Sequence, residues 1–194
     1  MPVKRGSIEY ERRMLLKKLL LPFDARVEPP CPLTAYSLLF CEILSINIQR
    51  RVRTLYCANW KMTAADAGHV YVFRDTRDGS ASIVKIGSTT AHDPEHRIAQ
   101  WRKTLHTTSS SGELFALFTF TCVHALFAEK VIQALLFCQW LPKRVNARSG
   151  ARLLEYFDVS DLRALEMLCR AVVRHVDWYC GVKNRQATMY NIDV

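Results

Sequence analysis

The chain has 194 residues, and its 49% hydrophobic content supports a packed core and argues against wholesale disorder. The formal net charge is +9 at pH 7, which favours polyanionic partners, either nucleic acid or an anionic surface. A basic charge that serves solubility alone is the other interpretation. The length fits one domain with a substantial extension or two small domains.

The cysteines and apolar segments favour a soluble intracellular protein. The seven cysteines are odd in number and form no C-x-x-C pair, so buried free thiols in a reducing compartment are the simplest account. The N-terminus lacks the apolar core of a signal peptide. The apolar run over residues 33–48 is shorter than a membrane span and is interrupted by Glu42, which favours a buried helix and no membrane association.

Residues 1–65 are predicted to form a basic helical extension. Apolar positions predict a helix over residues 7–21, a proline-rich linker follows over residues 22–33, and a second helix is expected over residues 33–50. Basic residues with aromatic neighbours stand near its end: Arg50, Arg51, Arg53, Tyr56 and Trp60. This combination suits phosphate contact with stacking, or else a solvated helix end. The extension is also a candidate surface for a protein partner.

A β-hairpin that leads into a helix is predicted next. Two segments rich in β-branched residues, 70–72 and 83–86, flank a turn that contains Asp-Gly. Gly87 ends the second strand, and Pro94 begins a helix that runs to residue 105.

Two further segments have clear periodicity. Residues 113–122 alternate and predict a third strand, and residues 124–140 predict a strongly apolar helix that ends before Pro142. The residues expected on one face of the strand are Leu114, Ala116, Phe118 and Phe120.

The last part of the chain is predicted to hold a basic loop over residues 143–152 and a short strand over residues 153–159. A helix follows with Ser160 as its N-cap, and residues 181–194 are expected to form a loose tail. The pattern indicates an α+β domain over residues 66–176, with a small, mostly antiparallel three-stranded sheet flanked by helices. Residues 177–194 are assigned to the C-terminal tail.

Glu129 is the strongest single candidate for chemistry, because a carboxylate in a strongly apolar helix needs a partner or a metal. A hard cation such as Mg²⁺ or Mn²⁺ accepts few protein carboxylates and keeps water ligands for a substrate phosphate. The alternative is a carboxylate at an exposed helix edge, solvated or paired with an arginine. Four histidines are candidate general bases or ordinary surface residues: His92, His96, His106 and His124.

Three residues near the hairpin are further catalytic candidates. Arg97 could hold a phosphate bidentately, or form a surface ion pair with Glu95 or Asp93. Tyr71 could be a core residue, or its hydroxyl could bind a water or a phosphate. Lys85 has apolar neighbours, although strand alternation alone would also allow it to face solvent.

Taken in order, these residues resemble a known family, the GIY-YIG endonuclease superfamily. Within it, the chain is most similar to the T-five Orf172-type DNA-binding domain, which meiotically up-regulated-gene-type proteins also carry. The resemblance implies a small α/β sandwich that binds DNA and, in active members, cleaves a phosphodiester with one divalent metal. The residues that carry it are Val70-Tyr71-Val72, Lys85-Ile86-Gly87, Arg97, Ala128-Glu129 and Glu155-Tyr156-Phe157.

The resemblance also implies roles for individual residues. Glu129 would bind the metal, Arg97 would stabilise the phosphate, and Tyr71 would position or activate the water. Gly87 would allow close backbone approach. Lys85 replaces the tyrosine of the second motif, and burial or positive neighbours would have to lower its pKa for it to act as a base.

Three functions are therefore open: a metal-dependent endonuclease, a non-catalytic DNA-binding module, and a protein-interaction domain on the same scaffold. The basic residues expected to contact DNA are Arg50, Arg51, Arg53, Lys103, Lys143, Arg144 and Arg148.

Overall fold

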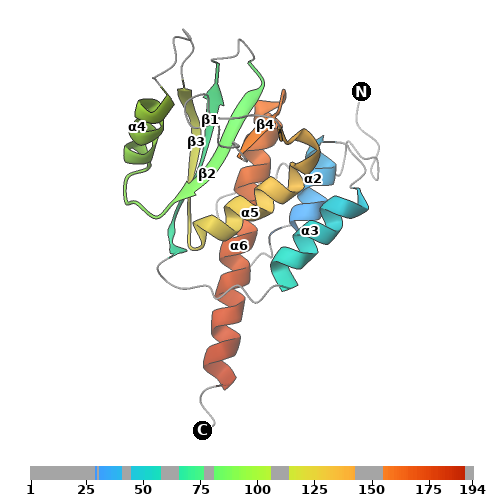
Figure 1. Ribbon diagram of the computed structural model, residues 1–194. Helices are drawn as coiled ribbons and strands as arrows, with labels where there is room; N and C mark the ends of the chain where they lie inside the picture. Colours follow the sequence, from blue (N-terminus) through green and yellow to red (C-terminus); the bar gives the residue numbers. More distant parts are fainter. Residues whose placement is uncertain are drawn as a thin grey trace, which may run out of the picture.

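The computed structural model describes residues 29, 31–40, 45–57, 66–76, 81–105, 114–142 and 155–190 (Figure 1). The predicted helix over residues 7–21, most of the predicted linker and the basic loop over residues 143–152 lie outside the described residues.

The centre of the fold is a four-stranded antiparallel sheet with the strand order β3-β1-β2-β4. The strands are β1 (Gly68–Asp75), β2 (Ile83–Thr89), β3 (Leu114–Cys122) and β4 (Tyr156–Asp158). The prediction of a three-stranded sheet is wrong, because the short last strand joins the sheet beside β2. Its pairing partner lies far away in the sequence, so local periodicity reveals the strand and not its neighbour.

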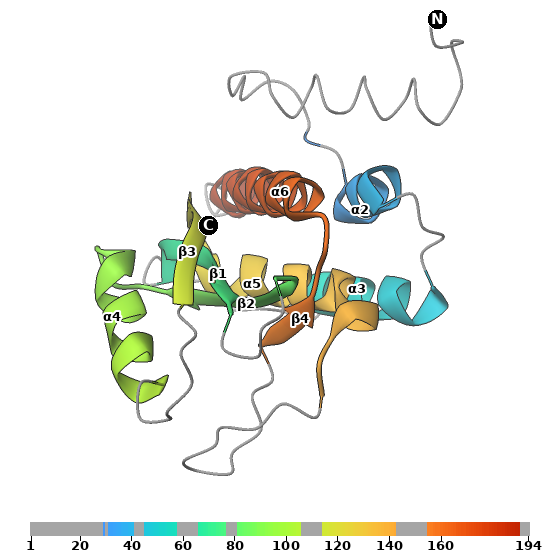
Figure 2. The same cartoon turned by 90° about the horizontal axis from the view of Figure 1, so that it is seen from above.

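One face of the sheet forms the main hydrophobic core. Val70, Val72, Val84 and Ile86 on this face are fully buried. Helix α5 (Ala125–Leu135) packs on β1 and β2, and helix α6 (Leu162–Tyr190) packs beside it on β3 (Figure 2). The β-branched residues that predicted the hairpin therefore also supply its buried face.

The opposite face carries a separate, smaller cluster. Tyr71 and Phe73 are buried on it, and Trp101 of helix α4 (Pro94–Leu105) packs against them. Strand alternation places Tyr71 on the face opposite to Val70 and Val72. This face holds most of the candidate site residues.

Strand β3 contains a bulge that changes which of its side chains share a face. Val72 pairs with Phe118, whereas the next residue, Phe73, pairs with Ala116. Leu117 is thus the extra residue, and Ala116 lies on the same face as Phe73 and the smaller cluster, whereas Phe118 lies on the face of the main core. The prediction that Leu114 and Ala116 share a face with the two phenylalanines is wrong, because an uninterrupted period of two cannot anticipate an inserted residue.

The described part of the N-terminal extension belongs to the main core. It contains two helices, α2 (Pro32–Phe40) and α3 (Ile46–Cys57), where a single helix over residues 33–50 was expected. Their buried residues Tyr36, Leu39, Ile48 and Val52 lie in the same cluster as the sheet and α5. Because most residues of α3 are polar or basic, its sequence did not predict that Ile48 and Val52 would be buried in the core.

The helices after β3 also differ from their predictions. The apolar helix α5 ends at Leu135, and a short 3-10 helix η2 (Phe137–Gln139) follows. Helix α6 begins one residue after Asp161, whose carboxylate accepts a hydrogen bond from the amide of Ala164 at 2.8 Å. Asp161, and not Ser160, is therefore the N-cap.

Helix α6 continues to Tyr190, so the loose tail expected from residue 181 is helical for most of its length. Its last turns project beyond the sheet in Figure 1. Among the described residues, no helix combines the length and apolar character that crossing a membrane requires.

Candidate functional site

Three of the four predicted catalytic residues converge on the face of the smaller cluster. Tyr71 comes from β1, Lys85 from β2 and Arg97 from the first turn of α4. Trp101, one turn further along α4, and Glu155, directly before β4, complete the group. We call Tyr71, Lys85, Arg97, Trp101 and Glu155 the lysine cluster.

Lys85 is fully buried at the centre of the lysine cluster. Its ammonium donates to the Glu155 carboxylate, and its Nζ lies 4.1 Å from the centroid of the Trp101 ring. The rings of Tyr71 and Tyr156 are each 5.9 Å away. Burial lowers the pKa of Lys85, and the charge and hydrogen bond of Glu155 oppose that shift. The expectation that alternation could turn Lys85 to solvent is wrong, because α4 covers this face.

Tyr71 lies over Gly87, its direct partner across the β1–β2 ladder. A Cβ atom on Gly87 would stand 2.4 Å from the Tyr71 hydroxyl oxygen, so only glycine leaves room for this ring. The ring stacks on Phe73 at 4.6 Å. Burial raises the pKa of Tyr71, and the positive charge of Arg97 nearby acts in the opposite direction. Gly87 thus permits a close approach to its backbone, and the group that approaches is the side chain of Tyr71.

Arg97 is half-buried at the outer side of the lysine cluster. Its guanidinium donates to the Gln100 side chain at 2.8 Å and lies 5.4 Å from the Trp101 ring. No carboxylate in the described part of the chain lies within ion-pair distance of it, so the expected pairing with Asp93 or Glu95 does not occur. Arg97 is the cation of this cluster best placed to meet an anion from solution.

Glu129 belongs to a different layer. Its side chain on α5 is nearly buried, and it accepts hydrogen bonds from the Ser88 hydroxyl and, at 2.7 Å, from the Gln133 amide. The Lys130 ammonium lies 3.4 Å from the same carboxylate. Because side chains alternate along β2, Ser88 faces α5 while Lys85 faces α4. Glu129 therefore influences Lys85 through its charge and makes no direct contact with it.

The donor set around Glu129 fits a divalent cation poorly. Both carboxylate oxygens already accept hydrogen bonds, and an ammonium lies beside one of them. Among the described residues, no group of three or more His, Cys, Asp or Glu side chains is arranged to hold a metal ion. The alternative expectation, a carboxylate at an exposed helix edge that is solvated or paired with an arginine, does not describe this arrangement either, because Glu129 is nearly buried and its charged neighbour is Lys130.

The predicted DNA-contacting residues are only partly described. Arg50, Arg51 and Arg53 are exposed on α3. The side chain of Lys103, and residues Lys143, Arg144 and Arg148, lie outside the described part. Of the histidines, His92 and His96 are exposed, whereas His124 is buried with its ring nitrogen 3.7 Å from the Asp66 carboxylate, and His106 lies outside the described part.

Sequence reasoning assigned no role to Trp101 or Glu155. Glu155 was only part of a motif. A buried lysine needs a carboxylate partner, and that requirement was the one signal that could have prompted a search for Glu155.

The fold and the lysine cluster define a small α+β domain in which two strands and a helix bring a tyrosine, a lysine and an arginine together. The chain belongs to the T5orf172 domain family, which matches residues 68–178. The match runs from the start of β1 into α6 and so includes the sheet, α4, α5 and the lysine cluster. Comparisons with curated proteins and with solved structures give no match.

Proposed function

We propose that this chain is a DNA-binding protein that contacts the phosphate backbone through Arg97 and through the basic residues of α3. The observation that carries the proposal is the match of residues 68–178 to the T5orf172 domain, a family of DNA-binding and endonuclease-like domains. The net charge of +9 is consistent with a polyanionic partner. The order of Tyr71, Gly87, Arg97 and Glu129 further supports placing the domain in the GIY-YIG superfamily.

The basic residues proposed to contact phosphates are carried by helices on both faces of the sheet, since α4 covers the face opposite to α5. Figure 2 shows α4 at one end of the molecule, α3 at the other and α5 between them. Arg97 lies on α4, Lys130 on α5, and Arg50, Arg51 and Arg53 on α3. Guanidinium groups suit this task because they are weakly hydrated and donate two parallel hydrogen bonds to a phosphate.

DNA affinity is expected to fall steeply with salt and to depend on Arg97. Arg97→Gln should weaken binding about 10-fold, because a charge-assisted hydrogen bond contributes roughly 1.5–3 kcal/mol, and should reduce the salt slope by about 1. Fluorescence anisotropy with a labelled duplex at several salt concentrations measures both quantities. Arg163→Gln is the matched control, since it removes the same charge from an exposed position on α6. An equal loss in both variants would show that only total charge matters, and no binding at moderate salt would favour the protein-interaction function.

Hydrolysis of DNA is the second candidate function. It is favoured by the meeting of a tyrosine hydroxyl, an arginine and a buried lysine whose pKa is lowered by burial. A lysine with a lowered pKa can act as a general base nearer to neutral pH. The poor fit of Glu129 to a divalent cation counts against this function.

Plasmid nicking in Mg²⁺ or Mn²⁺ separates the two candidates. If the chain hydrolyses DNA, supercoiled plasmid becomes nicked, and nicking falls at least about 100-fold in Arg97→Ala, as expected for the loss of charge stabilisation in a transition state. The same loss in Glu129→Ala would assign the carboxylate to the reaction. Binding without nicking in either metal rejects hydrolysis and leaves DNA binding as the function.

A further inference from the structure

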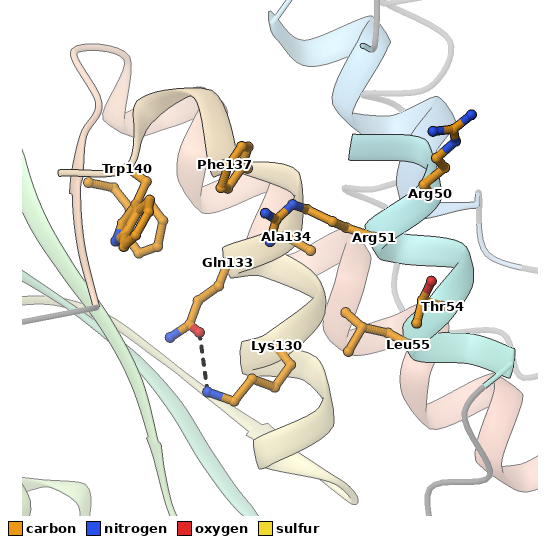
Figure 3. A pocket seen from close by; sticks show the side chains of 10 residues that line it. Arg50, Arg51, Thr54, Leu55, Lys130, Gln133, Ala134, Phe137 and Trp140 are labelled. Carbon is orange, nitrogen blue, oxygen red and sulfur yellow. Dashed lines mark hydrogen bonds between the residues drawn. The ribbon is translucent and has the colours of Figure 1, made fainter. Parts of the chain in front are cut away.

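A groove with a cavity volume of about 510 Å³ lies between α3 and the segment formed by α5 and η2, as Figure 3 shows. Its volume is within the range of sites that enclose a small ligand. The residues that line it are Arg50, Arg51, Thr54, Leu55, Lys130, Gln133, Ala134, Phe137, Trp140 and Phe157. Three of them are cations, and none is a carboxylate, so the lining favours an anionic occupant.

Flat side chains form a continuous series along one wall of this groove. The guanidinium carbon of Arg51 lies 3.7 Å from the centroid of the Phe137 ring. Phe137 in turn stacks on Trp140, with centroids 6.0 Å apart and planes inclined by 25°. In Figure 3, Arg51 extends from α3 across the groove toward Phe137. We call Arg51, Phe137 and Trp140 the stacking series.

Arg51 has its charge available for a ligand. Its side chain is exposed, and no carboxylate in the described part of the chain forms an ion pair with it. The contact with Phe137 holds the guanidinium plane against the ring. Guanidinium planes and aromatic rings are the two kinds of surface on which unpaired nucleobases stack in proteins.

The groove also adjoins the Glu129 network. Gln133 lines the groove, and its amide donates to the Glu129 carboxylate at 2.7 Å and to the carbonyl oxygen of Ile86 at 3.3 Å. Lys130 lines the groove too and lies beside the same carboxylate. An anion in the groove would therefore be only one side chain away from β2.

We propose that this groove binds a single nucleotide, with the base against the stacking series and the phosphate neutralised by the surrounding cations. A planar, anionic ligand is the chemistry that a guanidinium, two aromatic rings and further cations recognise together. The nucleotide is either a free mononucleotide or an unpaired nucleotide of a DNA strand, and the second case rests on the proposed function.

The test uses fluorescence anisotropy to compare how the full chain binds two labelled duplexes. One duplex is fully paired, and the other is the same duplex with a single unpaired thymidine inserted in one strand. The wild type is expected to bind the second duplex about 10-fold more tightly, since base stacking on protein side chains contributes roughly 1–3 kcal/mol. Arg51→Gln should abolish this preference. Arg53→Gln is the matched control, because Arg53 is also exposed on the same helix and does not line the groove. Thymidine monophosphate, titrated by calorimetry, tests the free ligand.

Each outcome decides the proposal. A preference lost in Arg51→Gln and kept in Arg53→Gln supports it. Equal affinity for the two duplexes, or a preference that both variants keep, overturns it for the DNA strand and leaves the proposed function intact. Binding of thymidine monophosphate that needs Arg51, without any DNA binding, supports a mononucleotide site and rejects the proposed function. Binding of neither ligand overturns both.

Discussion

Replacing Glu155 with glutamine is expected to destabilise the protein by about 2–3 kcal/mol at neutral pH. The substitution keeps the shape of the side chain and removes the charge that compensates Lys85, which is fully buried among aromatic rings. Breaking a fully buried ion pair costs roughly 3–5 kcal/mol. We expect less because the Glu155 side chain is 39% exposed and water reaches that end of the pair. Urea unfolding followed by circular dichroism measures the loss.

The loss should depend on pH with a defined sign. Burial already holds the pKa of Lys85 below its ordinary value of 10.5, and removing Glu155 lowers that pKa further. A lysine whose pKa is lower in the folded than in the unfolded state destabilises the folded state at every pH where it is protonated in both. This cost disappears as the pH rises and the lysine loses its proton. The difference between Glu155→Gln and the wild type should therefore be full where Lys85 stays protonated in both folded proteins, and should shrink as the pH rises through the lowered pKa of Lys85 toward 10.5.

A second substitution tests the cause. In Lys85→Met/Glu155→Gln the buried charge is gone and an apolar chain of similar length fills the aromatic surroundings, so most of the lost stability should return. If the double variant is no more stable than Glu155→Gln, the loss arises from packing around β4 and not from the uncompensated ammonium. A Glu155→Gln variant as stable as the wild type would contradict the role assigned to the pair.

Gly87→Ala is expected to destabilise the protein by about 2 kcal/mol, as overpacking of a well-filled site typically does. The new methyl group would stand 2.4 Å from the Tyr71 hydroxyl oxygen and 2.6 Å from its ring carbon. Tyr71 cannot move aside easily because it stacks on Phe73 and packs against Trp101. Thermal and urea unfolding measure the effect. DNA affinity should fall as well, since displacing Tyr71 disturbs the packing of Trp101, against which Arg97 lies.

Two controls separate this clash from the general effect of replacing glycine. Gly181→Ala places a methyl group on α6 with no atom within 4 Å, and should stabilise the helix by roughly 0.5–1 kcal/mol. In a Tyr71→Ala background the clash is absent, so Gly87→Ala should cost much less there, and a double-mutant cycle reports the coupling. Equal costs in both backgrounds would show that Tyr71 is not what excludes a side chain at position 87.

The features that follow from local sequence were predicted well. The hairpin, α4, β3 and the apolar helix α5 each have a periodicity that can be read within about ten residues. What could not be predicted depends on contacts between distant segments. The three-residue strand β4 acquires its place from Ile83 and Lys85 of β2, and the bulge at Leu117 appears only when β3 is laid beside β1.

The same distinction applies to the candidate site. Alternation and helix phase put Tyr71, Lys85 and Arg97 near one another, and the structure brings them together. Glu155 is separated from Lys85 by 70 positions, so the pairing of β2 with β4 decides their contact. Glu129 was identified correctly as a carboxylate that needs partners, but Ser88 and Gln133 supply them from positions that have no distinctive pattern.

The two outer strands of the sheet also limit self-association. A long, flat edge strand offers unpaired backbone groups to other chains and invites aggregation. Here β4 is only three residues long, and its neighbours Trp140 and Leu141 bridge to it through backbone contacts. At the other edge, the bulge in β3 interrupts the regular spacing of the strand. Neither edge is a long, regular template for another strand. The short β4 and the bulge in β3 therefore help to keep the sheet from pairing with other molecules.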